Sequence, residues 1–108
     1  MIYEWRVYEI AEGKRAALHE RFTNHSLRLF EKHGMGIVGF WEGKFGGRGV
    51  AICYILSFTD QSHLDRAWRD FREDPEWQLV KAESERNGPL VDKITSTTLT
   101  PTDYSPLK

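Results

Sequence analysis

The sequence predicts an α+β domain whose elements run strand, helix, strand, strand, helix, strand. One observation is an apolar run with weak alternation over residues 50–58, which is typical of a strand buried on both faces. A second is that only two helical regions remain outside the strands. In this element order both regions cover the same face of a sheet. The opposite face then needs a partner, so we expect a homodimer in which two sheets meet and enclose a space.

The first half of the chain predicts a strand followed by a helix. Residues 2–10 are rich in β-branched and aromatic residues, and their alternation places Tyr3, Trp5 and Val7 on one face. The opposite face carries a mixed row of residues: Ile2, Glu4, Arg6, Tyr8 and Ile10. The helix is expected to end near Gly34, and its buried face is marked by apolar residues and one histidine at helical spacing: Leu18, Phe22, His25 and Leu29.

The middle of the chain predicts a β-hairpin. Residues 35–45 and 50–58 are extended runs separated by Gly46-Gly47-Arg48-Gly49. A glycine-rich connection this short favours a tight turn with residues at positive φ. We therefore expect the second and third strands to be antiparallel neighbours in a four-stranded antiparallel sheet.

The second half predicts two helices and a last strand. Asp60 or Ser62 can cap the first of these helices, whose buried stripe consists of Leu64, Ala67, Trp68 and Phe71. Asp74 can cap a separate short helix, because Pro75 suits the first helical position. The remaining assignments are a stop at residues 87–89, a threonine-rich strand at 90–100 and an extended C-terminal arm at 101–108.

Length and composition limit the class of protein. The 108 residues suffice for one domain with a single core. The 15 basic and 16 acidic residues nearly cancel, which disfavours binding to nucleic acid or to an anionic membrane. Cys53 is the only cysteine, so neither an intrachain disulfide nor a cysteine-based metal site is expected. With no signal peptide or apolar membrane span evident, we expect a soluble, cytoplasmic protein.

A polar row on the first strand is the strongest candidate site. Alternation aligns Glu4, Arg6 and Tyr8 on one sheet face, and Tyr54 on the third strand can join them. In one interpretation the charged residues pair with each other or with the partner subunit in a polar dimer seam. In the other they line a pocket at the centre of the dimeric barrel, where Arg6 holds an anionic or carbonyl group and the tyrosines donate hydrogen bonds.

The histidines and glycines give weaker indications. His25 lies on the expected buried face of the first helix, where it is either a satisfied structural residue or a proton-transfer group. His19 and His63 are expected in solvent, and His33 is expected near carbonyls at the helix end. No metal-ligand cluster, phosphate loop or nucleophile elbow is present in the sequence, so we expect neither a metal nor another cofactor.

These observations favour a homodimer that binds a small apolar or aromatic molecule. The expected pocket contains Arg6, Tyr8 and Tyr54, and we expect Glu4, Trp41 and Trp77 to contact the ligand. If the protein is an enzyme, Arg6 stabilises an enolate or carboxylate, and a tyrosine or His25 moves a proton. The alternative is a non-enzymatic interaction module that uses residues 104–107 and the helix around Trp77 for partner contacts.

Four segments in order resemble the NIPSNAP family. They are Met1-Ile2-Tyr3-Glu4-Trp5-Arg6-Val7-Tyr8, Val38-Gly39-Phe40-Trp41, Asp74-Pro75-Glu76-Trp77 and the stretch from Pro101 to Leu107. The resemblance covers nearly the whole chain and implies a ferredoxin-like fold that dimerises into an α+β barrel. Bacterial members are mostly uncharacterised, whereas eukaryotic relatives act in mitochondria and vesicles through longer chains.

The resemblance adds a functional analogy and one departure. The same barrel architecture serves cofactor-free monooxygenases and isomerases, so a related activity is the enzymatic expectation for this chain. Tyr54 stands where family members often have histidine, which implies altered chemistry if that position is catalytic elsewhere.

Overall fold

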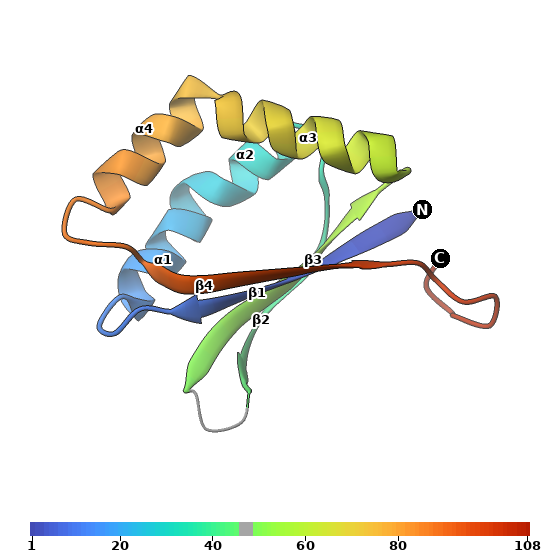
Figure 1. Cartoon of the computed structure of the whole chain (residues 1–108), viewed down its shortest axis with the longest axis horizontal. Coiled ribbons are helices and arrows are strands. Elements are labelled where there is room, and N and C mark those ends of the chain that lie inside the picture. The colour runs from blue at the N-terminus through green and yellow to red at the C-terminus, as the bar shows by residue number, and fades with distance from the viewer. Residues whose placement is uncertain (46–48) are drawn as a thin grey trace.

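Four antiparallel strands form a single sheet in the order β2-β3-β1-β4, and the helices pack on one of its faces (Figure 1). The computed structural model describes residues 1–45 and 49–108. The elements are β1 (Ile2–Ile10), α1 (Arg15–Arg21), η1 (Phe22–Ser26), α2 (Leu27–Lys32), β2 (Gly36–Lys44), β3 (Val50–Phe58), α3 (Gln61–Glu73), α4 (Pro75–Ser84) and β4 (Val91–Leu99). The predicted α+β class, element order and ferredoxin-like topology are confirmed.

The core lies between the helices and the sheet. Its most completely buried large side chains come from the helices, from β3 and from the residue just before β4: Leu18, Leu29, Phe30, Tyr54, Leu56, Phe58 and Leu90. The other face of the sheet, which we call the open face, carries no helix in the described part of the chain (Figure 1). On that face Cys53 is nevertheless buried, and its thiol contacts the carbonyl of Trp41 on the neighbouring strand. β3 is therefore largely buried on both faces, as its apolar run predicted.

The first helical region differs from the expected regular helix. A five-residue π-helix, η1, separates α1 from α2 and adds a residue to the turn. Ser26 consequently takes the buried position that helical spacing had assigned to His25. His25 is half-buried and faces α4, beside Val80 and Ser84. The prediction that His25 lies on the buried face towards the sheet was wrong for this reason.

Two aspartates begin the later helices as the sequence predicted. The Asp60 side chain accepts a hydrogen bond from the backbone N–H of His63, and Asp74 accepts one from the backbone N–H of Glu76. The second oxygen of Asp74 also accepts from Lys32 Nζ and pairs with His33 Nε2, each at 2.8 Å. His33 stands at the C-terminal end of α2, as expected, but its side chain contacts a carboxylate instead of helix-end carbonyls. Asp74 therefore ties α2 to the start of α4.

We expect the Asp74→Asn variant to be less stable than the wild type near neutral pH, with a thermal midpoint lower by several degrees. Hydrogen bonds from Lys32, from His33 and from the Glu76 backbone hold the pKa of Asp74 well below its usual range. A carboxylate with a lowered pKa in the folded state contributes stability above its unfolded pKa of about 4 and loses it as the pH falls further. Thermal melts followed by circular dichroism should show a difference in midpoint between the wild type and Asp74→Asn. That difference should be smaller at about pH 3 than at about pH 7.

Asp70 supplies the matched control for this prediction, because it lies on the exposed side of α3 and pairs with the adjacent, equally exposed Arg69. Asp70→Asn should melt close to the wild type at both pH values. A gap between Asp74→Asn and the wild type that stays constant with pH would show that the charge on Asp74 is not what stabilises the fold.

The segment boundaries show smaller differences from expectation. α4 ends at Ser84, before the stop at residues 87–89, where Gly88 adopts a φ of 108°. The C-terminal segment is not a fully extended arm: the backbone N–H of Ser105 donates to the carbonyl of Thr102 and closes a turn. Most of the predicted glycine turn, residues 46–48, lies outside the described residues, although the hairpin pairing of β2 with β3 is confirmed.

Candidate functional site

The polar row of β1 faces the helices and not the open face. The Trp68 indole on α3 donates a hydrogen bond of 2.5 Å to Glu4, and the guanidinium of Arg6 lies 4.2 Å from the centre of the Trp68 ring. The Tyr8 ring packs against Phe22 of η1. Placing this row in a dimer seam or in a pocket at the barrel centre was wrong, because these side chains lie inside the protomer's own core. The pairing of Glu4 with Arg6, which the first interpretation allowed, is confirmed.

Arg6 is held by three partners within that core. Its Nε donates to the Tyr54 hydroxyl at 2.9 Å, Nη1 donates to Glu4 at 3.2 Å, and Nη2 donates to the Tyr8 hydroxyl at 3.4 Å. The Tyr54 hydroxyl in turn donates to Tyr8 at 2.8 Å. The prediction that Glu4, Arg6, Tyr8 and Tyr54 lie together is confirmed. We call these four residues the Arg6 network.

Burial and hydrogen bonding shift the pKa values of two members of the Arg6 network, Tyr54 and Arg6. Burial raises the pKa of Tyr54 well above its usual value, so its phenol remains neutral. Burial alone lowers the pKa of Arg6, but the interactions with Tyr54, Tyr8 and Glu4 outweigh it and raise the value. Ser96, directly opposite Arg6 on β4, donates a further hydrogen bond to Glu4. The buried charges are therefore paired and hydrogen-bonded, which is the usual condition for a structural ion pair.

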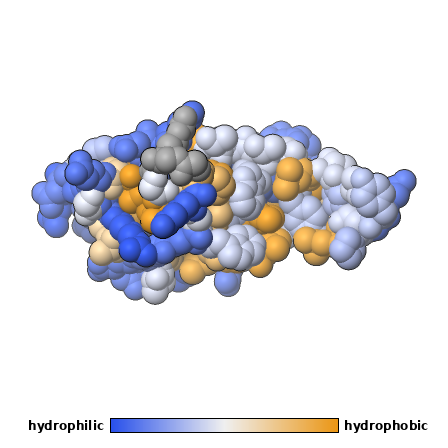
Figure 2. Space-filling view, turned by 90° about the horizontal axis from the view of Figure 1, so that it is seen from below, coloured by the Kyte–Doolittle hydropathy of each residue, from blue (hydrophilic) through white to orange (hydrophobic). Residues whose placement is uncertain are grey.

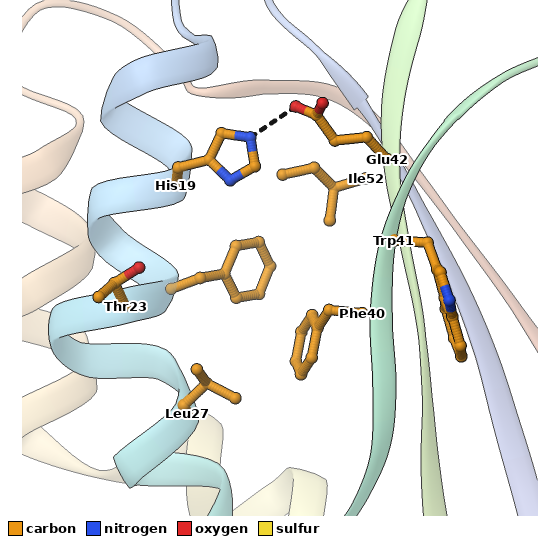
Figure 3. A pocket seen from close by; sticks show the side chains of 8 residues that line it. His19, Thr23, Leu27, Phe40, Trp41, Glu42 and Ile52 are labelled. Carbon is orange, nitrogen blue, oxygen red and sulfur yellow. Dashed lines mark hydrogen bonds and ion pairs between the residues drawn. The ribbon is translucent and has the colours of Figure 1, made fainter.

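A cavity of about 290 Å³ lies beside this network, between the first helical region and β2 (Figure 3). Its walls are mainly apolar, and the residues that line it are His19, Phe22, Thr23, Leu27, Phe40, Trp41, Glu42 and Ile52. η1 supplies Phe22 and Thr23, so the irregular turn of the helix forms one wall. π-helical turns are frequent at functional sites, because they displace side chains from regular helical positions.

Charged residues stand at the mouth of the cavity. Arg15 donates two hydrogen bonds of 2.7 Å to the two carboxylate oxygens of Glu42, and His19 Nε2 lies 2.6 Å from one of them. These hydrogen bonds, first from Arg15 and then from His19, lower the pKa of Glu42 to about 2. Glu42 is consequently an anion at neutral pH. We call these three residues the Glu42 cluster.

An aromatic wall separates the cavity from the Arg6 network. The Phe40 ring stacks on the Tyr54 ring with centroids 4.7 Å apart, and Phe22 meets Tyr54 edge-on at 5.6 Å. Tyr54 has no exposed surface. A ligand in the cavity would therefore contact phenylalanine rings first, and the phenols of Tyr8 and Tyr54 lie behind them.

Three other predicted site residues lie away from the cavity interior. Trp41 contributes to the lining, but Figure 3 shows its ring on the opposite side of β2, and 49 % of its surface is exposed. Trp77 packs against Phe71 of α3, and His25 faces α4. The structure thus does not join Trp41, Trp77 and His25 to the Arg6 network.

The sequence interpretation missed His19, Glu42 and Arg15. A signal was present, because Arg15 and His19 are four residues apart and so share one helix face. Glu42 follows Phe40 at the spacing that places two strand residues on the same face. The pairing of these two faces depends on how the helix sits on the sheet, which no local pattern contains.

Neither a metal site nor a membrane-spanning helix is found in the described part of the chain. Among residues 1–45 and 49–108, no cluster of three or more histidine, cysteine or acidic side chains has the geometry to hold a metal ion. Within the same residues, no helix has both the length and the apolar character that crossing a bilayer requires.

Comparisons with known proteins point to one family. The NIPSNAP family model matches residues 3–106. Over 79 residues the chain is 29 % identical to human "Protein NipSnap homolog 3A", a match that covers 72 % of this chain but only 31 % of that protein. The crystal structure of protein Atu4242 from Agrobacterium tumefaciens superposes with a TM-score of 0.84 at 21 % identity, covering all of both chains.

A more distant likeness is to SnoaB, a cofactor-independent oxygenase from Streptomyces nogalater. The TM-score is 0.62 at 15 % identity, over 97 % of this chain and 96 % of SnoaB. This likeness shows a shared fold. The family match, in contrast, extends over almost the whole sequence: the chain belongs to the NIPSNAP family.

Proposed function

We propose that this protein is a homodimer that binds a small apolar or aromatic molecule in the cavity between the first helical region and β2. The observation that carries the proposal is the cavity itself, whose volume of about 290 Å³ and apolar walls suit one or two aromatic rings. Phe22, Leu27 and Phe40 offer faces against which a flat ring can pack.

An enzymatic role without a cofactor is consistent with this cavity. The oxygenase activity of SnoaB shows what the same fold supports in another protein, although fold alone does not transfer an activity. In this chain Arg6, Tyr8 and Tyr54 lie behind the aromatic wall. We therefore assign the Arg6 network the role of supporting that wall, in place of the direct catalytic contacts expected from the sequence.

The second copy is proposed to cover the open face. On this face Trp5, Val7 and Ile55 are partly exposed beside the buried Tyr3 and Cys53, and Trp41 of β2 is 49 % exposed. Figure 2 shows that face, where apolar patches lie among paler side chains along the middle of the sheet. Exposed apolar patches of this kind mark interaction surfaces, and a two-fold axis allows the same patch to meet itself. The single buried thiol of Cys53 also suits a reducing, cytoplasmic compartment.

The Leu27→Trp variant tests the ligand site, because the larger side chain should fill the cavity. We expect 4-nitroanisole, a neutral aromatic probe, to shift the backbone amide signals of cavity residues in wild-type NMR spectra. Leu27→Trp should weaken this binding by about tenfold or more, since one packed aromatic contact is worth about that factor.

Leu79 provides the matched control, because it lies on α4 with 59 % of its surface exposed. Leu79→Trp should bind the probe like the wild type, and circular dichroism should show that both variants are folded. Probe shifts that map outside the cavity, or equal binding by both variants, would refute the proposed site and favour the interaction module.

A further inference from the structure

His19 is the one imidazole at the cavity mouth among the described residues, and its two ring nitrogens have different surroundings. Nε2 lies 2.6 Å from the Glu42 carboxylate. Figure 3 shows the second nitrogen, Nδ1, turned towards the space enclosed by the helix and β2. Nδ1 has no hydrogen-bond partner within residues 1–45 and 49–108. One nitrogen is therefore engaged, and the other is available to a ligand.

The charge on Glu42 determines which nitrogen of a neutral His19 carries the proton. Arg15 donates to both oxygens of Glu42, so the carboxylate is an anion and can only accept hydrogen bonds. Nε2 must then be the N–H donor, and Nδ1 keeps its lone pair. The groups that face His19 are Glu42 from β2, Arg15 from the same helix and the apolar ring of Phe22. This arrangement resembles the carboxylate–imidazole pair of a general base.

We propose that His19 accepts the proton of a phenolic or enolic hydroxyl on a ligand in the cavity whose ring packs against the adjoining rings of Phe22 and Phe40. The inference rests on the proposed function and names its ligand class. The ligand O–H bond breaks, an Nδ1–H bond forms, and the electron pair remains on oxygen as a phenolate or enolate. Glu42 is a positioning residue: it orients the ring and stabilises the imidazolium that results. Arg15 holds Glu42 in place.

The chemistry of the site supports an acidic hydroxyl over a carboxylate ligand. Arg15, the cation bound to Glu42, already makes two hydrogen bonds to it, and the anionic Glu42 would repel a second carboxylate at the mouth. A neutral ring with one hydroxyl avoids this repulsion on entry. It becomes charged only after binding, when the imidazolium beside it provides the opposite charge.

The experiment compares 4-nitrophenol with 4-nitroanisole, which has the same ring but no hydroxyl proton. Ionised 4-nitrophenol absorbs at a longer wavelength than the neutral form, so absorbance reports proton transfer directly. We expect wild-type protein to bind 4-nitrophenol more tightly than 4-nitroanisole. We also expect a larger fraction of 4-nitrophenol to be ionised when it is bound than when it is free at the same pH. In His19→Gln the preference should fall by about tenfold or more, the size expected for a lost charge-assisted hydrogen bond.

Two further variants separate proton transfer from general damage to the site. Glu42→Gln should lower the phenolate fraction of bound 4-nitrophenol, because the imidazolium loses its counter-charge. His25→Gln makes the same change as His19→Gln at a histidine outside the cavity, and it should behave like the wild type.

The outcomes distinguish this inference from the proposed function. Binding of 4-nitroanisole without any preference for the phenol, or an unchanged preference in His19→Gln, overturns the role of His19 and leaves the cavity as a binding site. Failure of wild-type protein to bind either probe overturns the proposed function and this inference together. The inference is supported if His19→Gln loses both the preference for 4-nitrophenol and the phenolate absorbance band while His25→Gln keeps both.

Discussion

Replacing Arg6 by alanine is expected to lower the free energy of unfolding by about 3–5 kcal/mol, the usual cost of breaking a buried ion pair from one side. Glu4 is 4 % exposed and would keep its carboxylate in the core after its cation is removed. The variant also leaves the Tyr54 hydroxyl without the donor at Nε and empties the space over the Trp68 ring. Urea unfolding followed by circular dichroism measures the change.

A double variant tests the cause of this loss. Glu4→Gln combined with Arg6→Met removes both charges and keeps an apolar stem against Trp68, so it should recover most of the lost stability. Arg69→Ala removes an exposed arginine from α3 and should change stability by no more than about 0.5 kcal/mol. A cost for Arg6→Ala similar to that of Arg69→Ala would mean that Glu4 is not held as a buried charge, and the structural role of the Arg6 network would be wrong.

The Val7→Lys variant is expected to convert the proposed dimer into a monomer. Val7 lies on the open face near the middle of the sheet, between Cys53 of β3 and Thr95 of β4. A lysine there can extend into solvent from a monomer, whereas a dimer would bury its charge twice, once from each copy. We expect association to weaken by about a hundredfold or more, since an unpaired buried charge costs several kcal/mol.

Native mass spectrometry and sedimentation at several concentrations measure this effect. The control is Ile94→Lys, which places the same charge at an exposed position that shares the face of Tyr8. It should leave the dimer intact. A wild-type monomer at every concentration would refute the proposed assembly, and a dimeric Val7→Lys protein would place the interface on another surface.

Much of the fold could be predicted because its determinants are local. Alternation along β1 separates Tyr3, Trp5 and Val7 from the polar row, and the strand pairings confirm those two faces. Asp60 and Asp74 cap helices through hydrogen bonds to backbone groups only two or three residues away. Such signals need no knowledge of distant segments, so the sequence is sufficient to show them.

The candidate site was predicted only in part. Glu4, Arg6, Tyr8 and Tyr54 were correctly expected to meet, because they occupy the same face of strands in one sheet. Their surroundings were not predicted. Burying two charged side chains in the helix-covered core costs free energy unless each has partners there. The partners of Glu4 include Trp68 and Ser96, which are 64 and 92 residues away along the chain.

The sequence by itself therefore determined the order of the elements, the caps of the later helices and which residues share each strand face. The tertiary structure alone decided which face the helices cover, that η1 displaces His25 towards α4, and that His19 meets Glu42 at a cavity mouth. The physical reason is the range of the interactions. Periodicity and capping act within a few residues, whereas burial of a charge and closure of a cavity depend on segments that only packing brings together.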